Sequence, residues 1–413
     1  MASWFEDGRL RLAVGVEDTF VPQEQPGRRR LDEYELTQHY HLWHEDLGHA
    51  AATGADMIRW GVPWYLLEPS PGRFRWDWLD RVVDRLDELG LTCIVDLMHY
   101  GTPLWLDNQF LNAAYPERVA AYAARVADRY RGRLQVWTPL NEPMINAIYC
   151  GERGTWPPYL TGHDGFVKVA LQVARGIVRT QQAIAEVQPE ASFVHVEASF
   201  RYTGEWFPFD LELVSRRRFL VLDLLTGRVD DGHELAGYLT GHGVGDEDLA
   251  WFRERAVVPD VIGVNYYPGF TTSRFEPGSA EPIPVEAGTA GLEEVLRDFQ
   301  GRYGRPVFLT ETSRAGTVEE RRAWLHDSLG LVGRLRQQGF PLVGYTWWPL
   351  FALVDWKYRE TTDPVERWLL PMGLLELEPD GAGVLRRVPT GLVAEFGRLA
   401  EQLRHPAVPG ERR

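Results

Sequence analysis

The feature that most constrains the fold is a regular alternation of short apolar segments with longer amphipathic ones. Parallel strands that are joined by helices are buried on both faces, so they read as near-continuous apolar runs. Eight such units predict an α/β fold in which the parallel sheet closes into a single (β/α)8 TIM barrel. The predicted strands are 10–16, 55–62, 92–98, 134–140, 192–198, 261–267, 306–310 and 342–348, and helix candidates between them include 78–89, 116–130, 166–187 and 317–338.

The chain has 413 residues, a length that would also allow two or three ordinary domains. No linker rich in Ser, Gly and Pro divides it, and Gly and Pro recur at short intervals throughout. We therefore predict one domain over residues 1–413, with an active site at the C-terminal ends of the strands. Segment 269–291, rich in Pro, Gly and Glu, predicts a long loop at the rim of that site.

The formal net charge of −15 argues against nucleic acid or an anionic membrane surface as a partner. The first residues lack the basic and apolar regions of a signal peptide, and no apolar run approaches the ~20 residues of a membrane span. Cys93 and Cys150 are too few for a disulfide framework, so a cytoplasmic protein is expected, although a bond between the two stays open. The oligomeric state is unknown.

Polar side chains gather at the predicted strand ends, where the active sites of such barrels lie. Glu142 follows the fourth strand within Asn141-Glu142-Pro143, and Glu311 stands at the end of the seventh. Two carboxylates on separate strand ends are the groups required to cleave a glycosidic bond. The other candidates at strand ends are Arg59, His99, Asn141, Asn265, Tyr267 and Trp348.

Glycosidic cleavage needs one carboxyl that is protonated near neutral pH and one that stays ionised. Glu142 fits the acid/base and Glu311 the nucleophile, and Arg59 is placed to keep Glu311 ionised. Side chains alternate along a strand, so Asn265 and Tyr267 should share the face that looks into the site.

Asn141 and Glu142 are neighbours, so both can face a ligand only if the chain bends at the strand end. Pro143 predicts an extended backbone at Glu142 itself. The histidine-rich segment from His39 to His49 misses the helical zinc spacing and reads as an ordinary helix. We expect neither a metal nor a cofactor.

Together these segments resemble family 1 of the glycoside hydrolases, the β-glucosidase family, within the clan of (β/α)8-barrel retaining glycosidases. The resemblance covers about residues 10–400 and implies a small-molecule glycoside as substrate. It also implies a sugar platform at Trp348 and contacts from Asp355 and Trp356 to distal hydroxyls. The segments that carry it are Thr138–Pro143, Leu309–Thr312, Ile58–Trp64, Met98–Pro103, Val261–Tyr267 and Gly344–Trp356.

Three departures from the family pattern bear on the substrate. The usual Gln near the end of the first strand has no counterpart in Val14–Phe20, Asp355 stands where a longer Glu is usual, and Thr312-Ser313 replaces Asn-Gly. The resemblance therefore implies a retaining β-glycosidase that acts on β-glucoside-like substrates through a covalent glycosyl-enzyme intermediate. A transglycosidase with the same two carboxylates and a non-catalytic carbohydrate-binding barrel remain alternatives.

Overall fold

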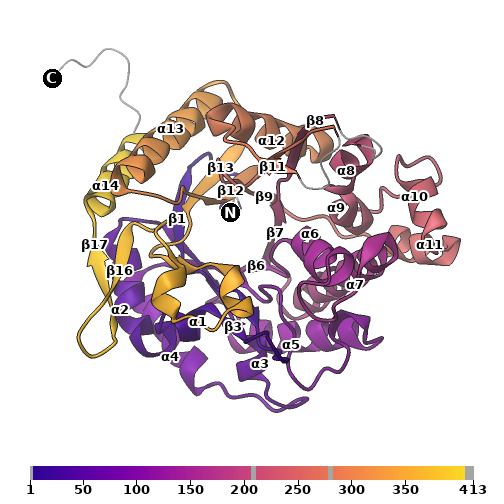
Figure 1. The fold of residues 1–413 in the computed structure, drawn as a ribbon, viewed down its shortest axis with the longest axis horizontal. Helices are drawn as coiled ribbons and strands as arrows, with labels where there is room; N and C mark the ends of the chain where they lie inside the picture. Colours follow the sequence, from indigo (N-terminus) through magenta and orange to yellow (C-terminus); the bar gives the residue numbers. More distant parts are fainter. Residues whose placement is uncertain (1–2, 206–210, 278–281, 405–413) are drawn as a thin grey trace.

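The computed structural model describes residues 3–205, 211–277 and 282–404. Eight parallel strands form a closed barrel in the order β1-β13-β12-β9-β7-β6-β5-β4, with β1 pairing to both β13 and β4 (Figure 1). The predicted fold class is confirmed. The barrel strands are β1 (Arg11–Gly15), β4 (Met57–Gly61), β5 (Thr92–Asp96), β6 (Val136–Thr138), β7 (Ser192–Ala198), β9 (Val261–Asn265), β12 (Val307–Thr312) and β13 (Leu342–Trp347).

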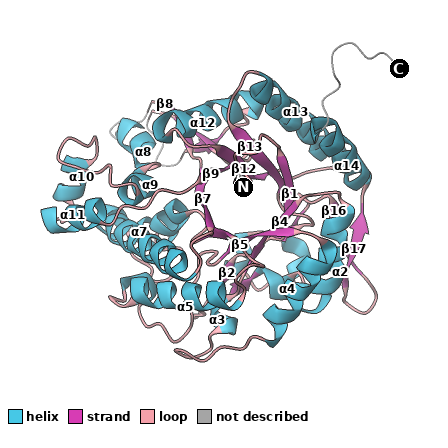
Figure 2. Ribbon diagram, turned by 180° about the vertical axis from the view of Figure 1, so that it is seen from behind, coloured by secondary structure: helices cyan, strands magenta, loops and turns pink. Residues whose placement is uncertain are grey.

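Helices form a ring around the barrel (Figure 2). In α4 the apolar residues Leu79, Val82, Val83 and Leu86 are buried at helical spacing, so the helix turns one face to the barrel. The principal helices of the ring are α2 (His39–Ala52), α4 (Asp77–Leu89), α5 (Tyr115–Arg129), α7 (Gly162–Val187), α9 (Leu220–Leu225), α12 (Gly288–Tyr303), α13 (Val318–Gln337) and α14 (Gly391–Arg404).

Shorter elements decorate the barrel and connect its units. The helical ones are α1 (Glu33–Leu36), α3 (Trp64–Leu67), η1 (Gln109–Leu111), α6 (Pro143–Asn146), η2 (Ala147–Glu152), α8 (Leu211–Arg217), α10 (Ala236–Gly241), α11 (Asp246–Glu254), η3 (Trp356–Glu360) and η4 (Val365–Trp368). The strands are β2 (Phe20–Val21), β3 (Leu31–Asp32), β8 (Arg201–Gly204), β10 (Thr272–Phe275), β11 (Ile283–Pro284), β14 (Leu353–Val354), β15 (Leu369–Leu370), β16 (Leu375–Pro379) and β17 (Leu385–Pro389).

The interior of the barrel is apolar toward the N-terminal ends of the strands. Trp4 and Phe5 precede the first strand, and their side chains pack against a cluster of barrel-strand residues that includes Ala13, Met57 and Phe308. Burying these side chains closes that end of the barrel. Polar groups inside the barrel are therefore found toward the opposite, C-terminal end.

The segment after the sixth barrel strand differs from the prediction. Residues 269–291 do not form one long loop, because they contain β10, β11 and the start of α12, while residues 278–281 lie outside the described part. Strand β10 pairs in parallel with β8, and Thr272 and Phe275 are buried in this contact. The composition of a segment does not reveal a partner strand that is distant in sequence, so the prediction of a single long loop was wrong.

Within the described ranges, the structure has no helix long and apolar enough to cross a membrane. Cys93 and Cys150 are both buried free thiols, so they form no disulfide with each other. Burial raises the pKa of the Cys93 thiol well above its ordinary value and that of Cys150 to about 12. Both thiols therefore stay protonated and unreactive.

Candidate active site

A cavity of about 400 Å³ opens at the C-terminal ends of the barrel strands. It is lined by the predicted residues His99, Glu142, Asn265, Tyr267, Glu311, Asp355 and Trp356. The structure therefore brings most of the predicted site together. Arg59, Asn141 and Trp348 lie behind this lining and are buried.

Glu142 stands at a sharp turn between β6 and α6. Its φ of 43° and ψ of 63° are left-handed, so the extended backbone that Pro143 predicted is wrong. The chain must turn from a strand into a helix at this point, and Pro143 occupies the first turn of that helix. The N–H groups of Asn141 and Glu142 donate to Met98 (2.9 Å) and Val196 (3.0 Å), which hold the turn.

The bend that the sequence required between Asn141 and Glu142 is present. The Glu142 carboxyl accepts hydrogen bonds from the Tyr100 hydroxyl and from Nδ2 of Asn265 at 2.8 Å. Asn141 instead meets Arg59, whose Nη2 donates to its Oδ1 at 2.6 Å. Asn141 also donates from Nδ2 to the Tyr100 hydroxyl at 3.0 Å, so the two neighbours belong to one hydrogen-bond network that Tyr100 joins.

Glu311 lies in β12 and has a cation as its partner. Nη1 of Arg59 donates to its Oε1, and the Tyr267 hydroxyl donates to its Oε2 at 2.6 Å. Arg59 is fully buried and also binds Asp96, with Nη2 and Oδ2 2.6 Å apart. The guanidinium is therefore held in place by two carboxylates and one amide.

The pKa values of both carboxyls are perturbed. Burial raises the pKa of Glu142, although hydrogen bonds from Tyr100 and Asn265 oppose the rise. Burial also raises the pKa of Glu311 to about 7, against the charge of Arg59 and together with the charge of Glu142. Because the charge of Glu142 disfavours ionisation of Glu311, protonation of Glu142 favours the ionised form of Glu311.

The alternation predicted for the sixth barrel strand is confirmed. Asn265 and Tyr267 meet Glu142 and Glu311 respectively, whereas the Tyr266 hydroxyl donates to the carbonyl of Gly288 at 2.7 Å. The hydroxyl of Thr310 donates to Oδ1 of Asn265 at 2.7 Å. This contact fixes the Asn265 amide so that its NH2 group points to Glu142.

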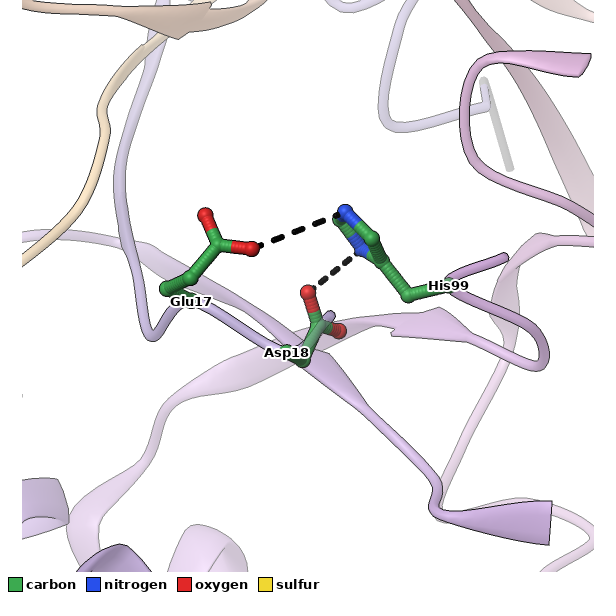
Figure 3. A group of neighbouring side chains, drawn as sticks. All are labelled: Glu17, Asp18 and His99. Atoms are coloured by element: carbon green, nitrogen blue, oxygen red, sulfur yellow. Dashed lines mark ion pairs between the residues drawn. The ribbon is translucent and has the colours of Figure 1, made fainter. Parts of the chain in front are cut away.

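His99 lies within a group of carboxylates (Figure 3). Its Nδ1 is 2.5 Å from Oδ1 of Asp18 and its Nε2 is 3.9 Å from Oε1 of Glu17, while Asp96 lies 3.3 Å from Nδ1. Burial opposes a charge on the imidazole, but the charge and hydrogen bond of Asp18 raise the pKa of His99 well above its ordinary value. His99 is therefore paired with acids on one side of the cavity.

Glu17, Asp18 and His99 lie close enough to suggest a metal site. However, 2.5 Å between Asp18 and His99 is a hydrogen-bond distance, whereas two ligands of one tetrahedral zinc lie about 3.3 Å apart, as metal–ligand bonds of about 2 Å require. The geometry fits a shared proton rather than an ion. A second group, Asp223, His233 and Glu234, is already neutralised by Arg302, which binds both carboxylates.

His39, in the histidine-rich segment, is engaged by other side chains. Its Nδ1 lies 2.7 Å from Oδ2 of Asp46, and its Nε2 accepts a hydrogen bond from the Trp60 indole at 2.9 Å. The segment forms the ordinary helix that the sequence predicted, α2. Its histidine therefore supports packing within the fold.

Trp348 does not form a wall of the cavity, which differs from the expected sugar platform. Its side chain is 1% exposed, and the Arg59 guanidinium lies over the indole at 4.6 Å from the ring centroid. Its Nε1 donates to Oε2 of Glu17 at 2.8 Å. A β-carbon on Gly15 would lie 2.0 Å from the indole, so the absence of a side chain there lets the ring pack against the β1 backbone. Trp348 thus supports Glu17 and Arg59 from behind.

Asp355 and Trp356 reach the cavity from the loop after β14. Asp355 caps η3 by accepting a hydrogen bond from the N–H of Lys357 at 2.9 Å. The Trp356 indole packs against Trp156, with ring centroids 5.0 Å apart, and against Tyr100 at 5.4 Å. The loop therefore presents one acid and one aromatic face to the cavity.

Several residues of the site were not singled out from the sequence. Tyr100 donates to Glu142, and Glu197 in β7 accepts from the N–H of Met144 at 3.2 Å, directly beside the Glu142 turn. Glu17 and Asp18 follow β1 as two adjacent buried acids. Glu17, Asp18 and Glu197 each lie within or just after an apolar strand. That position is the sequence signal by which these three acids could have been found.

A (β/α)8 barrel with two buried carboxyls at its strand ends, one bound to arginine, belongs to the class of barrel glycosidases. The profile of glycosyl hydrolase family 1 matches residues 2–202. The chain is 23% identical over 367 residues to beta-glucosidase A of Thermotoga maritima, covering 77% of this chain and 78% of that protein. It is also 23% identical over 406 residues to a 6-phospho-beta-glucosidase of Clostridium longisporum, covering 84% and 82%.

Among solved structures, a beta-glucosidase from Thermotoga maritima in complex with glucoimidazole superposes with a TM-score of 0.81 at 18% identity, covering 96% of this chain and 98% of that one. The chain is a glycoside hydrolase, similar over residues 2–202 to glycosyl hydrolase family 1 and over most of its length to beta-glucosidases.

Proposed function

We propose that this glycoside hydrolase is a retaining β-glycosidase that hydrolyses O-glycosidic bonds of small β-glucoside-like substrates. The similarity to beta-glucosidases supports this substrate class. The observation that carries the proposal is the unequal environment of the two carboxyls. Glu311 contacts a buried guanidinium, whereas the donors that the described residues offer to Glu142, Tyr100 and Asn265, are neutral.

The different partners of the two carboxyls assign the proton to Glu142. When Glu142 carries the proton, its charge no longer raises the pKa of Glu311, and the contact with Arg59 favours the ionised form of Glu311. Glu311 is then the nucleophile and Glu142 the general acid. The Tyr267 hydroxyl, which donates to Glu311, holds the nucleophile in one orientation.

In the first step, an oxygen of Glu311 attacks the anomeric carbon and the bond to the aglycone oxygen breaks. Glu142 transfers its proton to that oxygen, which leaves as an alcohol, and the sugar is left as an ester on Glu311. In the second step, Glu142 removes a proton from water, whose oxygen attacks the anomeric carbon and releases Glu311. Two inversions at one carbon retain its configuration.

The remaining cavity residues would bind the sugar. We propose that His99, Asn265, Asp355 and Trp356 contact it directly, since they line the cavity. Arg59, Asn141 and Trp348 would act through the residues they contact. Transfer of the glycosyl unit to an alcohol in place of water would use the same two carboxyls.

The test is hydrolysis of p-nitrophenyl β-D-glucoside by the wild type and by Glu311→Gln, with proton NMR of the first sugar released. We expect Glu311→Gln to lose at least ~1,000-fold in kcat, because a carboxamide cannot form the ester. The wild type should release the β-anomer first. Release of the α-anomer, or near wild-type turnover by Glu311→Gln, would reject the proposal, and adding methanol would reveal any transfer.

A further inference from the structure

The turn that carries Glu142 has a backbone N–H whose acceptor comes from another strand. The N–H of Glu142 itself donates to the carbonyl of Val196 at 3.0 Å, and Pro143 has no N–H. The next N–H along the chain, that of Met144, donates to Oε1 of Glu197 at 3.2 Å. The acceptor that holds the turn after Pro143 is therefore a side chain of β7.

The residue before a helix commonly accepts the N–H two or three positions later with its own side chain. Glu142 stands at that position before α6, but its carboxyl makes no such hydrogen bond. The carboxyl accepts instead from Tyr100 and Asn265 in the cavity. Because Glu142 points into the cavity, the Met144 N–H lacks its usual acceptor, and Glu197 supplies one.

Glu197 lies behind the turn rather than in the cavity. Side chains alternate along a strand, and its neighbour Val196 belongs to the apolar cluster inside the barrel, so Glu197 points out of the barrel toward α6. Glu197 is buried and is not among the residues that line the cavity. It can therefore act on the reaction only through the backbone that carries Glu142.

Glu197 has a second buried neighbour, His195. Oε2 of Glu197 and Nε2 of His195 lie 3.5 Å apart, and neither has a hydrogen-bond partner elsewhere among the described residues. Burial raises the pKa of Glu197 well above its ordinary value, although the N–H groups of Met144 and Ala198 oppose the rise. Burial lowers the pKa of His195 to about 3. Both groups are therefore neutral near pH 7, with the carboxyl proton on Oε2, because Oε1 accepts the two N–H groups.

A neutral Glu197 suits the chemistry proposed for Glu142. The Glu142 carboxyl changes between its protonated and ionised forms in each turnover, and a negative charge on Glu197 would raise its pKa. The protonated Glu197 carboxyl holds the Met144 N–H without adding that charge. Glutamine offers a similar acceptor and donor, whereas leucine, which is close in size, has no acceptor.

We propose that Glu197 is the positioning residue of the acid/base Glu142, because its carboxyl binds the Met144 N–H and thereby fixes the turn. The inference rests on the proposed function, since it takes Glu142 to be the proton donor. The left-handed conformation of Glu142, with φ 43° and ψ 63°, is uncommon for a residue with a side chain and persists only where its surroundings hold it. Without an acceptor for Met144, we expect the turn to relax and the acid to lose its alignment with the departing oxygen.

The test compares kcat/KM for phenyl β-D-glucoside, whose leaving group needs an acid, and for 2,4-dinitrophenyl β-D-glucoside, whose leaving group does not. We expect Glu197→Leu to lose at least ~10-fold on the phenyl glucoside and to stay within about threefold on the other, because only proton donation is misaligned. Glu197→Gln should keep both substrates within about threefold of the wild type, because it retains the acceptor. A purely structural role would lower both substrates alike.

The matched control is Glu68→Leu. Glu68 is also buried and accepts a backbone N–H, that of Gly72 at 2.6 Å, but it lies outside the cavity lining. Any loss in this variant should be equal for the two glucosides. Equal effects on the two glucosides in Glu197→Leu, or a loss in Glu197→Gln as large as that in Glu197→Leu, would overturn the inference.

Amide exchange covers a Glu197→Leu protein that does not fold, and it requires no catalysis. In the wild type, the Met144 N–H should exchange with deuterium at least ~100-fold more slowly than an unprotected amide. Exchange at the unprotected rate would overturn the inference even if glycosides are cleaved. A protected Met144 N–H in a protein that cleaves neither glucoside would support the hydrogen bond to Glu197 and reject only the proposed function.

Discussion

At the scale of single residues, the site depends on what surrounds two carboxyls of similar burial. Glu142 and Glu311 are 7% and 4% exposed, so burial alone does not distinguish them. Their partners do, because an arginine contacts Glu311 while a tyrosine and an asparagine contact Glu142. The different roles proposed for the two carboxyls therefore depend on hydrogen-bond partners that lie in or just after β4, β5 and β9.

The charge of Glu142 raises the pKa of Glu311, so removing that charge should lower it. In Glu142→Gln, we expect the acid limb of kcat/KM for 2,4-dinitrophenyl β-D-glucoside to move to lower pH than in the wild type. The leaving group needs no acid, so this step stays measurable. An acid limb that stays in place or moves to higher pH would show that the two carboxyls are not coupled.

At the scale of elements, strand β1 approaches the end of β13 closely because Gly15 has no side chain. A β-carbon there would lie 2.0 Å from Cε3 and 2.2 Å from Cζ3 of Trp348, closer than real contacts allow. Gly15→Ala should displace the indole that holds Glu17 and reduce kcat/KM for the aryl glucoside by at least ~10-fold, because positioning is lost.

Circular dichroism should show that the barrel of Gly15→Ala persists. The matched control is Gly330→Ala in α13, where the nearest atom, of Arg334, is 3.7 Å from the added β-carbon. This change should leave activity intact. Full activity in Gly15→Ala would contradict this prediction, because it would show that the position of the Trp348 indole does not affect catalysis.

Helices α9 and α12 are joined by a buried ion pair. Asp223 is completely buried and accepts hydrogen bonds from Nε of Arg302 (3.0 Å) and from the Tyr303 hydroxyl (3.0 Å). Asp223→Asn should lower the free energy of unfolding at pH 7 by about 3 kcal/mol, because the arginine loses its buried charged partner and keeps only the half-exposed Glu234. Denaturant unfolding measures the change, and Asp231→Asn at an exposed position is the control.

The pH dependence of this contribution has a defined sign. Burial opposes ionisation of Asp223, but hydrogen bonds from His233 and Arg302 lower its pKa below the ordinary value of 3.8. The stabilisation is therefore fully present above pH 3.8 and is lost as the pH falls through the lowered pKa. The difference between wild type and Asp223→Asn should shrink in that acidic range, and a constant difference would contradict the assignment.

At the scale of the whole molecule, the barrel could be predicted from the sequence because its strands are continuous apolar runs that end in polar residues. Glu142 and Glu311 were recognisable for the same reason. The left-handed turn at Glu142, the pairing of β8 with β10 and the position of Trp348 could not be predicted, since each depends on contacts between distant segments. The network around Glu17 joins β1, β5 and β13, so no local pattern encodes it.

The N-terminal segment contacts the last barrel strand and the helix before it. Strand β1 pairs with β13, and Nη2 of Arg336 donates to the carbonyl of Gly8 at 2.6 Å. We propose on this basis that residues 1–413 form a single (β/α)8-barrel domain. Calorimetry of the full chain should show one cooperative unfolding transition.

A fragment of residues 1–202 tests this proposal. It would contain β1, β4, β5, β6 and β7 but lack β9, β12 and β13, which leaves two unpaired strand edges. We expect it to aggregate or to unfold without a cooperative transition. A soluble fragment with its own sharp transition would indicate two folding units.

The proposed mechanism requires Glu311 to form a covalent bond with the sugar, and this intermediate can be trapped. The wild type is incubated with 2,4-dinitrophenyl 2-deoxy-2-fluoro-β-D-glucoside, whose fluorine slows the release of the sugar, and is then digested and analysed by mass spectrometry. We predict one fluoroglucosyl adduct per chain, in the peptide that contains Glu311, and none in Glu311→Gln. An adduct on another residue, or hydrolysis of the unfluorinated glucoside by a protein that is never labelled, would contradict the claim.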